Sequence, residues 1–265
     1  MALGDNCCNA MEPWRTGIAS SDATHIWIRG YDVTTLMTQA GFTETIFLLH
    51  RARLPNPGER RLLNAILVAV ADHGAGAPSC AAARLVASGN RQSLSAAIAA
   101  GILAIGDEHG GAGSACMETI AAAVELAGRE SVSVEGAARR IVEEAVAAKK
   151  RVPGLGHRVH STDPRTAVLF DMARECGVAG DGVACMEALE RAASELIKPL
   201  PINIDGALAA VLYDLGFPPE FGKLVFIIGR VAGLTAEVAE EYAREKAMRI
   251  RIPVTYDGEP PREID

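Results

Sequence analysis

The chain has 265 residues, of which 49% are hydrophobic and 22% are charged, proportions typical of a globular protein. Its net charge of −7 argues against broad binding to nucleic acid or to an anionic membrane surface, although it leaves room for a local basic pocket. No apolar run approaches the ~20 residues that span a bilayer, so no membrane anchor is expected.

The N-terminal segment and the cysteines indicate a reducing compartment. Residues 1–15 are polar and lack a basic segment followed by an apolar stretch, so we expect no signal peptide and a cytoplasmic location. The cysteines show no spacing typical of a metal site, and we expect small buried hydrophobes plus two N-terminal thiols. They are Cys7, Cys8, Cys80, Cys116, Cys176 and Cys185.

Apolar residues recur at helical spacing along most of the chain, which predicts an all-α fold. The one strand-like stretch covers residues 25–29. Helices are expected at 32–40, 43–51 and 58–74, from Ser79, from Ser93, and at 112–127, 134–150, 164–176, 182–198, 206–215 and 218–247. The helix at 94–105 is apolar on nearly every face, so it should be buried centrally. The tail after Pro253 cannot continue a helix and should run over the surface or onto a partner subunit.

The first candidate site segment is Gly106-Asp-Glu-His109-Gly-Gly-Ala112. Glycines allow a ligand to approach the backbone, and the helix that follows offers free N–H groups at its start. A neutral His109 there can donate a hydrogen bond to a carbonyl oxygen and stabilise an enolate. Taken alone, a histidine before two glycines is more often a cap or turn residue.

The second segment is Gly154-Leu-Gly-His157-Arg-Val-His160, which precedes Asp163, Pro164 and Arg165. Asp163 is predicted to cap the next helix, with Pro164 at its first position. Arg165 then lies at the wrong end of the helix for a dipole-stabilised cation, so it either faces an anion or is an ordinary surface arginine. The two histidines lack a carboxylate or thiolate at suitable spacing, so no metal site is expected.

The third segment, Asn203-Ile-Asp205-Gly206, follows an apolar approach to a helix. Asp205 is explained equally well as a helix cap or as a base, because a carboxylate in a dry pocket can abstract a proton next to a carbonyl. Three further residues complete the candidates. His73 is predicted to end a helix, Arg230 interrupts an apolar helix and needs a partner or an anionic ligand, and Arg251 lies in Ile250-Arg251-Ile252-Pro253.

In their order and separation, these segments resemble the citrate synthase superfamily, which also includes citryl-CoA lyases. The resemblance runs from Ile26 to Gly258 and implies an all-α, citrate synthase-like fold. It identifies His109 with the catalytic histidine before Gly-Gly-Ala, and His157 with the oxaloacetate-binding histidine of Gly-His-Arg-Val. It identifies Asp205 with the catalytic aspartate of Asn-Val-Asp-Gly.

The resemblance also implies the remaining dicarboxylate contacts, which are His73, Arg165, Arg230 and Arg251. In the family the last arginine comes from the neighbouring subunit of a dimer. Arg249 stands close to Arg251 and is an alternative for that role.

The implied mechanism gives each residue type a role. Asp205 removes a proton from the methyl group of acetyl-CoA, while His109 donates a hydrogen bond to the thioester oxygen as it becomes an enolate. His157 polarises and then protonates the oxaloacetate carbonyl. Run backwards, the same site cleaves citryl-CoA to acetyl-CoA and oxaloacetate. Coenzyme A thioester is therefore substrate, and neither a permanently bound cofactor nor a metal is expected.

Two departures from common citrate synthases bear on function. The chain is much shorter, as are citryl-CoA lyases and the lyase module of ATP-citrate lyase. The loop from His157 to Arg165 is one residue shorter, and His160 and Ser161 replace basic residues that lie near the CoA phosphates in the family. We therefore favour a citryl-CoA lyase. The alternatives are a short citrate or 2-methylcitrate synthase, with which the retained His109 agrees, and a non-catalytic acyl-CoA or citrate-binding protein.

The resemblance finally implies a homodimer or higher homo-oligomer of two-domain subunits. Residues 1–111 and 218–265 would form the large domain, and residues 112–217 the small domain inserted into it. The cleft between them would hold citryl-CoA, or acetyl-CoA and oxaloacetate, and close over the substrate to exclude water.

Overall fold

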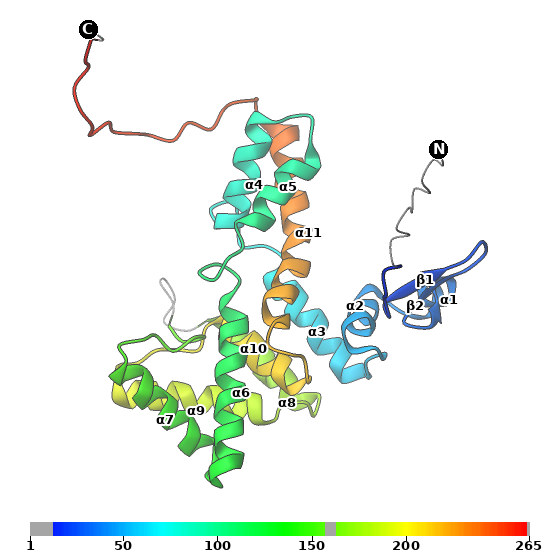
Figure 1. Cartoon of the computed structure of the whole chain (residues 1–265), viewed down its shortest axis with the longest axis vertical. Helices are drawn as coiled ribbons and strands as arrows, with labels where there is room; N and C mark the ends of the chain where they lie inside the picture. Colours follow the sequence, from blue (N-terminus) through cyan, green and yellow to red (C-terminus); the bar gives the residue numbers. More distant parts are fainter. Residues whose placement is uncertain (1–12, 157–162, 264–265) are drawn as a thin grey trace, which may run out of the picture. The chain divides into compact units, whose positions relative to one another are not determined.

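The computed structural model describes residues 13–156 and 163–263, and nearly all the secondary structure in these ranges is helical (Figure 1). The strands are β1 (Ala19–Ser21), β2 (Ile26–Ile28) and β3 (Tyr31–Asp32). The helices are α1 (Val33–Gln39), α2 (Phe42–Arg51), α3 (Pro57–Val70), α4 (Pro78–Gly89), α5 (Leu94–Leu103), α6 (Ala112–Glu130), α7 (Val134–Ala147), α8 (Pro164–Glu175), α9 (Asp181–Leu196), α10 (Ile204–Asp214) and α11 (Phe221–Arg244). The chain divides into two compact units, an N-terminal unit that ends at Arg60 and a second unit that begins at Arg61.

The N-terminal unit contains a small antiparallel sheet in the order β1-β2-β3. The strand expected at 25–29 is β2, and it pairs with β1 and β3, two short strands that the sequence pattern did not predict. The turn into β3 places Arg29 and Gly30 in the left-handed region, with φ of 49° and 85°. Asp32 then caps α1 by accepting the N–H group of Thr34 at 2.9 Å.

Helix α3 ends at Val70, four residues before the predicted end at Gly74. The Asp72 side chain accepts the N–H group of Gly74 at 2.6 Å, and Gly74 has φ of +83°, a conformation that cannot continue a helix. The prediction that His73 ends a helix was therefore wrong, because His73 lies in the exposed loop between α3 and α4.

Helices α4, α5 and α11 pack on one another around a cluster of buried apolar side chains that includes Ala83, Ala97 and Leu234. The contact is close at Gly101 of α5, where a Cβ atom would lie 2.7 Å from Leu234 and 2.9 Å from the carbonyl oxygen of Ser79. A small residue at this position thus lets α5 approach both neighbouring helices.

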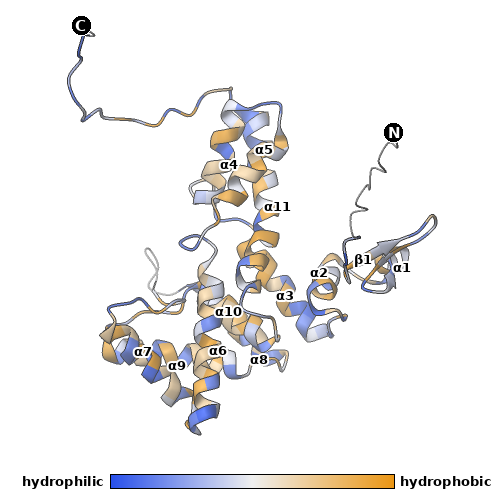
Figure 2. Ribbon diagram, in the orientation of Figure 1, coloured by the Kyte–Doolittle hydropathy of each residue, from blue (hydrophilic) through white to orange (hydrophobic). Residues whose placement is uncertain are grey.

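The prediction that α5 is buried centrally was wrong for a single copy of the chain. Only Ala97 and Gly101 are buried within α5, whereas Leu94 and Leu103 are 55% and 85% exposed. The helix carries no charged residue, and apolar colouring predominates along it (Figure 2). A charge-free helix with large exposed side chains is typical of a surface that another chain covers.

The remaining helices of the second unit form a group around α6 and α10 (Figure 1). Helix α6 packs on α7, α9 and α10, and α10 also packs on α8 and α9. Asp214 at the end of α10 accepts the N–H groups of Gly180, Gly182 and Val183 at 2.7–3.1 Å and so caps the start of α9. Burial nevertheless raises the pKa of Asp214.

Within the described residues, no helix is long and apolar enough to cross a membrane. The cysteines in these ranges are free thiols. Three of them are fully buried, as expected, and burial raises the pKa of each: Cys80, Cys116 and Cys185. Cys176 is half-buried, and the two N-terminal cysteines lie outside the described residues.

Candidate functional site

His109 lies in a tight loop between α5 and α6. The N–H group of Gly106 donates to the carbonyl oxygen of His109 at 3.0 Å, and the N–H groups of His109 and Gly111 donate to the carbonyl oxygen of Gly106 at 3.0 and 2.9 Å. Gly110 has φ of +84°, and a Cβ atom there would lie 2.5 Å from the Phe226 ring. The loop therefore needs glycine at this position to hold His109 against α11.

Ser79 fixes the orientation of the His109 ring. Its N–H group donates to Nε2 of His109 at 3.3 Å, and its Oγ lies 2.9 Å from the same nitrogen. The Ser79 Oγ also accepts from Nη1 of Arg230 at 3.1 Å, so its own proton is available to His109. Because Nε2 accepts from Ser79, we assign the ring proton to Nδ1, which is then the group that can donate to a ligand.

The electrostatic surroundings keep His109 neutral. Burial lowers the pKa of His109 below its ordinary value, and the nearby Arg230 and His73 lower it further. The ring also packs edge-on against Phe226, with 5.6 Å between centroids. A neutral imidazole whose Nδ1–H group has no acceptor in the described part of the chain suits the donation of a hydrogen bond to a developing oxyanion.

Arg230 is an arginine buried in the interior, only 3% exposed. Its Nε donates to the carbonyl oxygen of Val70 at 2.9 Å, and its guanidinium lies 4.7 Å from the centroid of the Phe226 ring. Within residues 13–156 and 163–263, no carboxylate forms an ion pair with Arg230. Arg230 therefore has partners, as predicted, but all of these partners are neutral. Its buried charge is left without a counter-charge among the described residues, which favours a role in binding an anion.

Asp205 lies in the first turn of α10, and the cap of this helix is Asn203. The Asn203 side chain accepts the N–H group of Gly206 at 3.1 Å, and its Nδ2 donates to the carbonyl oxygen of Gly156 at 2.9 Å. The alternative that Asp205 itself is the cap was therefore wrong. Asn203 thus fills the capping role, and the half-buried Asp205 lies two residues after it, in the first turn of the helix.

The backbone at Gly154 crosses the start of α10 in direct contact with the backbone of Gly206. A Cβ atom on Gly154 would lie 2.6 Å from Cys116 Sγ and 2.8 Å from the Cα atom of Gly206, and one on Gly206 would lie 2.5 Å from the carbonyl oxygen of Gly154. The N–H group of Asn203 donates to that oxygen at 3.0 Å. Asp205 is close enough to Cys116 to raise the pKa of this buried thiol, although burial is the larger cause. The crossing thus fixes the backbone that carries Asp205.

Asp163 caps α8 as predicted, with Pro164 at the first helical position. Arg165 donates through Nε and Nη2 to the two Asp163 oxygens, at 3.0 and 2.8 Å, and through Nη1 to the carbonyl oxygen of Ala69 at 3.2 Å. Binding of a substrate carboxylate by Arg165 stays a prediction, and in the structure its guanidinium faces an anion of its own chain. The anion is the carboxylate of Asp163, and one guanidinium edge links α8 to the end of α3.

The other candidates differ in how the structure places them. His157 lies outside the described residues. His73 is exposed in the loop before α4, close enough to affect the pKa of His109. Arg251 is exposed in the tail after α11, and no contact among the described residues joins it to His109 or Arg230. Arg249, the alternative to Arg251, forms an ion pair with Glu241.

A cavity of about 760 Å³ opens beside the start of α6 and the loop at 150–156. Lys150, Arg151 and Lys198 contribute positive charge to its lining, and Asp107 and Glu108, next to His109, contribute negative charge. Gly111 offers no side-chain cap to α6, so N–H groups at the start of this 19-residue helix remain for a ligand. The volume falls within the range of small-molecule sites.

Sequence reasoning missed Ser79 and Phe226, which hold His109 and Arg230 together. Ser79 was interpreted only as the start of a helix after Pro78, and serine at such a position is so common that nothing marked it further. The signal that the sequence offered was indirect. His109 and Arg230 each lacked a local partner that explained them, which indicated that another residue must contact both.

Comparison with known proteins places this geometry in a family. Residues 55–251 match the citrate synthase C-terminal domain. A glyoxysomal citrate synthase from Cucurbita maxima is 30% identical over 220 residues, which cover 79% of this chain and 40% of that protein. The 2-methylcitrate synthase 2 of Corynebacterium glutamicum is 32% identical over 217 residues, which cover 79% and 52%. The chain spans about half the length of these curated relatives.

A solved structure matches over a greater extent. Citryl-CoA lyase from Hydrogenobacter thermophilus is 40% identical, with a TM-score of 0.87, and the match covers 95% of this chain and 97% of that one. The expected helical fold and the resemblance noted in the sequence are both confirmed. Since the family match spans well over half of its length, the chain belongs to the citrate synthase family.

Proposed function

We propose that this chain is a carbon–carbon lyase that cleaves citryl-CoA to acetyl-CoA and oxaloacetate. The observation that carries the proposal is its 40% identity to a citryl-CoA lyase over nearly the whole of both chains. The two curated synthases are 30% and 32% identical and are matched over about half of their length. The second candidate, a short citrate or 2-methylcitrate synthase, is favoured by these sequence relatives and by the intact surroundings of His109.

The cleavage needs one base, one oxyanion donor and one acid. His157 takes the proton of the citryl hydroxyl group, a role that rests on the family resemblance. As the carbon–carbon bond breaks, its electron pair forms the enolate of acetyl-CoA, whose oxygen accepts a hydrogen bond from Nδ1 of His109. Asp205 returns a proton to the enolate carbon and so completes the methyl group. Oxaloacetate and acetyl-CoA leave, and the reverse sequence is condensation.

The positive groups hold the carboxylates of the citryl moiety. Arg230 is buried without a paired carboxylate among the described residues, which supports its binding to a substrate carboxylate. His73, on the loop next to α4, would bind at the same end of the site. Arg165 would release part of its contact with Asp163 to bind the substrate. Arg251 would enter from a second copy of the chain.

The 760 Å³ cavity would take the CoA part of the thioester. Its basic lining residues, Lys150, Arg151 and Lys198, suit phosphate groups, and the start of α6 adds N–H donors. Asp107 and Glu108 connect this cavity to His109, while Asn203 connects it to Asp205. A thioester bound there would therefore extend from the basic rim toward both catalytic groups.

A homodimer would cover the exposed side of α5. Leu94 and Leu103 expose large apolar side chains on a helix without charge, and burying each would contribute about 1.5–3 kcal/mol. We also propose the division into a large domain (1–111 and 218–265) and a small domain (112–217). The packing of α4, α5 and α11 in one group, and of α6 to α10 in another, supports this division of the second unit.

A coupled assay tests the function. Synthetic citryl-CoA is presented alone, and acetyl-CoA or propionyl-CoA is presented with several 2-oxo acids. We expect release of oxaloacetate from citryl-CoA, and its loss in Asp205→Asn but not in the control Asp171→Asn, an exposed aspartate on α8. Free citrate formed from acetyl-CoA and oxaloacetate would replace the lyase proposal with the synthase. Binding without turnover would indicate a non-catalytic acyl-CoA or citrate-binding protein.

A further inference from the structure

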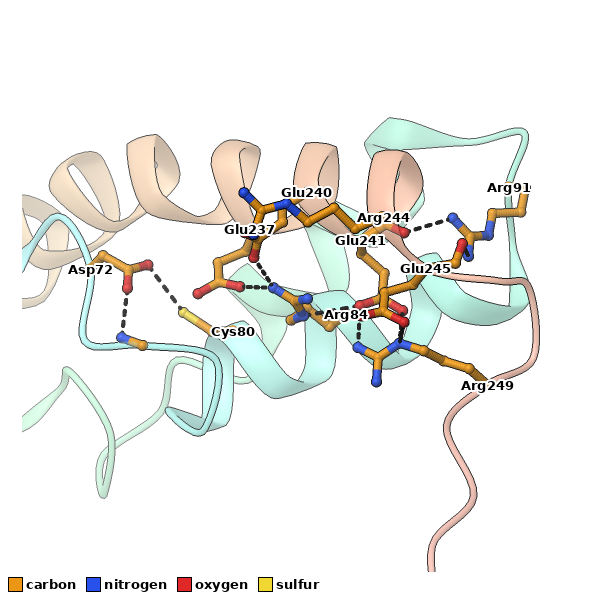
Figure 3. A network of polar contacts seen from close by, with 11 residues as sticks. Asp72, Cys80, Arg84, Arg91, Glu237, Glu240, Glu241, Arg244, Glu245 and Arg249 are labelled. Atoms are coloured by element: carbon orange, nitrogen blue, oxygen red, sulfur yellow. Dashed lines mark hydrogen bonds and ion pairs between the residues drawn. The ribbon is translucent and has the colours of Figure 1, made fainter.

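The end of α11 and the start of the tail are fastened to α4 by a network of ion pairs (Figure 3). Its centre is Glu241, whose side chain is fully buried. The Glu241 carboxylate accepts from Nε of Arg84 at 3.0 Å, and from Nε and Nη2 of Arg249 at 2.8 and 2.5 Å. One buried carboxylate therefore joins a helix of the site to the first residues of the tail.

The charges in this network are permanent at neutral pH. Arg84 also forms ion pairs with Glu237 and with Glu240, the latter at 2.8 Å, and these carboxylates raise the pKa of Arg84. The hydrogen bond from Arg249 is the largest cause of the lowered pKa of Glu241. Breaking the contact between Glu241 and Arg249 would leave a buried carboxylate with fewer donors, so the pair resists separation.

The backbone is fixed at the same place. Met248 has φ of 58°, and its N–H group donates to the carbonyl oxygen of Ser88 at 2.8 Å. Arg91 donates to the carbonyl oxygens of Glu241 and Glu245 at 2.9 and 2.7 Å, and so joins the loop after α4 to the end of α11. The chain thus turns sharply after α11, and its direction is set from both the backbone and the side chains.

The same network reaches the loop that carries His73. Cys80 donates to Asp72 at 3.5 Å, and ligand atoms of Asp72, Cys80 and Glu237 all lie within 4.8 Å of one another. A change at Arg84 would therefore disturb both ends of the network, whereas a change at Arg249 acts at the tail end alone.

Beyond Arg249 the tail leaves the helices and becomes exposed (Figure 1). Ile252, Val254 and Tyr256 are 68%, 86% and 76% exposed, so the apolar residues of the tail are not covered by their own chain. Arg251 follows Arg249 by two residues and so lies within about 7 Å of it along the chain. Fixing Arg249 consequently confines Arg251 to a small volume beside α4.

We propose that Glu241 and Arg249 are positioning residues that direct Arg251 into the substrate site of a second copy of this chain. The proposal rests on the role of Arg251 given above. Arg251 binds a substrate carboxylate in both ground and transition states, so loss of its positioning raises KM and leaves kcat nearly unchanged. The expected rise is about two- to tenfold, which corresponds to immobilising one long side chain.

The test compares Arg249→Ala and Arg249→Lys with Arg251→Ala. Arg244→Ala is the matched control, because Arg244 is 74% exposed at the end of α11 and, among the described residues, forms an ion pair with Glu240 alone. We expect KM for citryl-CoA to rise in Arg249→Ala, to recover partly in Arg249→Lys and to stay unchanged in the control, while the mass in solution stays that of the wild-type oligomer. A raised KM in Arg251→Ala with an unchanged KM in Arg249→Ala would overturn the positioning role and leave the proposed function standing. An unchanged KM in Arg251→Ala would refute the role of Arg251 itself.

Mixed dimers test whether the tail acts on the second copy. Chains carrying Arg249→Ala are combined with chains carrying Asp205→Asn, and the heterodimers are isolated by two different tags. The one site with an intact Asp205 then receives the intact tail of its partner, so its KM should return to the wild-type value. A KM that stays raised would show that the tail acts within its own chain and would overturn the proposal. Loss of the dimer in Arg249→Ala would also overturn it, since the pair would then only fasten the interface.

Discussion

Replacing Ser79 with alanine removes the hydroxyl group that joins Arg230 to His109, and its effects can be worked out from the contacts. Arg230 is 3% exposed and loses one of its acceptors, a charge-assisted hydrogen bond of 3.1 Å that contributes about 1.5–3 kcal/mol. At about 2–4 °C of Tm per kcal/mol, Tm should fall by about 3–12 °C. His109 keeps the backbone donor of Ser79 and loses the hydroxyl donor at 2.9 Å.

The effect on catalysis distinguishes a role of Ser79 in orienting His109 from a simple loss of stability. If about 1–2 kcal/mol of orientation is lost in the transition state, kcat for citryl-CoA cleavage falls about 5- to 30-fold. The hydroxyl donor favours neutral His109, so its loss raises the pKa of His109 toward the ordinary value of about 6.5, and the acid limb of kcat moves to higher pH. Ser88→Ala is the control, because the buried Ser88 hydroxyl on the same helix has no hydrogen-bond partner among the described residues. Equal kcat and equal pH profiles in the two variants would refute the reasoning.

Three further outcomes are expected. Gly206→Ala places a Cβ atom 2.5 Å from a carbonyl oxygen, so the free energy of unfolding measured in urea should fall by about 1–3 kcal/mol and turnover through Asp205 should drop. Gly128→Ala is the control, because a Cβ atom there meets open space and should not destabilise the chain. The pKa of Glu241 is lowered in the folded state, so its contribution to Tm is complete above about pH 4.3 and disappears as pH falls through the folded-state pKa. In Glu241→Gln the fall of Tm at acid pH should be less steep. An unchanged dependence of Tm on acid pH would contradict the assignment. Leu103→Glu should yield monomers in sedimentation, and a persisting dimer would place the interface elsewhere.

The sequence predicted what local chemistry decides. Asp163 caps α8 as expected, and Ser93, which was expected to begin a helix, caps α5, because capping depends on residues one to three positions apart. The helix that ends at Val70 was predicted too long, since the Asp72 side chain creates a turn that apolar periodicity does not register.

What the sequence missed depends on contacts between distant segments. Hydropathy identified α5 as a helix that needs burial, but it does not distinguish burial within one chain from burial against another. Ser79 and His109 are 30 positions apart, and a serine at a helix start carries no mark of its long-range partner. The bidentate contact of Arg165 with Asp163 is local, yet the cap pattern explained Asp163 so fully that a second partner for it was not considered.

The buried thiols give the protein natural reporters of its own opening. Alkylating reagents attack the thiolate, and burial raises the pKa of Cys185 to about 12, so this thiol stays protonated and unreactive near neutral pH while it is buried. Cys80 follows Ser79 in the chain and Cys116 lies against the Gly154 crossing, so modification of each requires a different part of the site to open. Labelling rates at the three cysteines, followed by mass spectrometry with and without CoA thioester, would therefore map which helices separate during turnover and which stay packed.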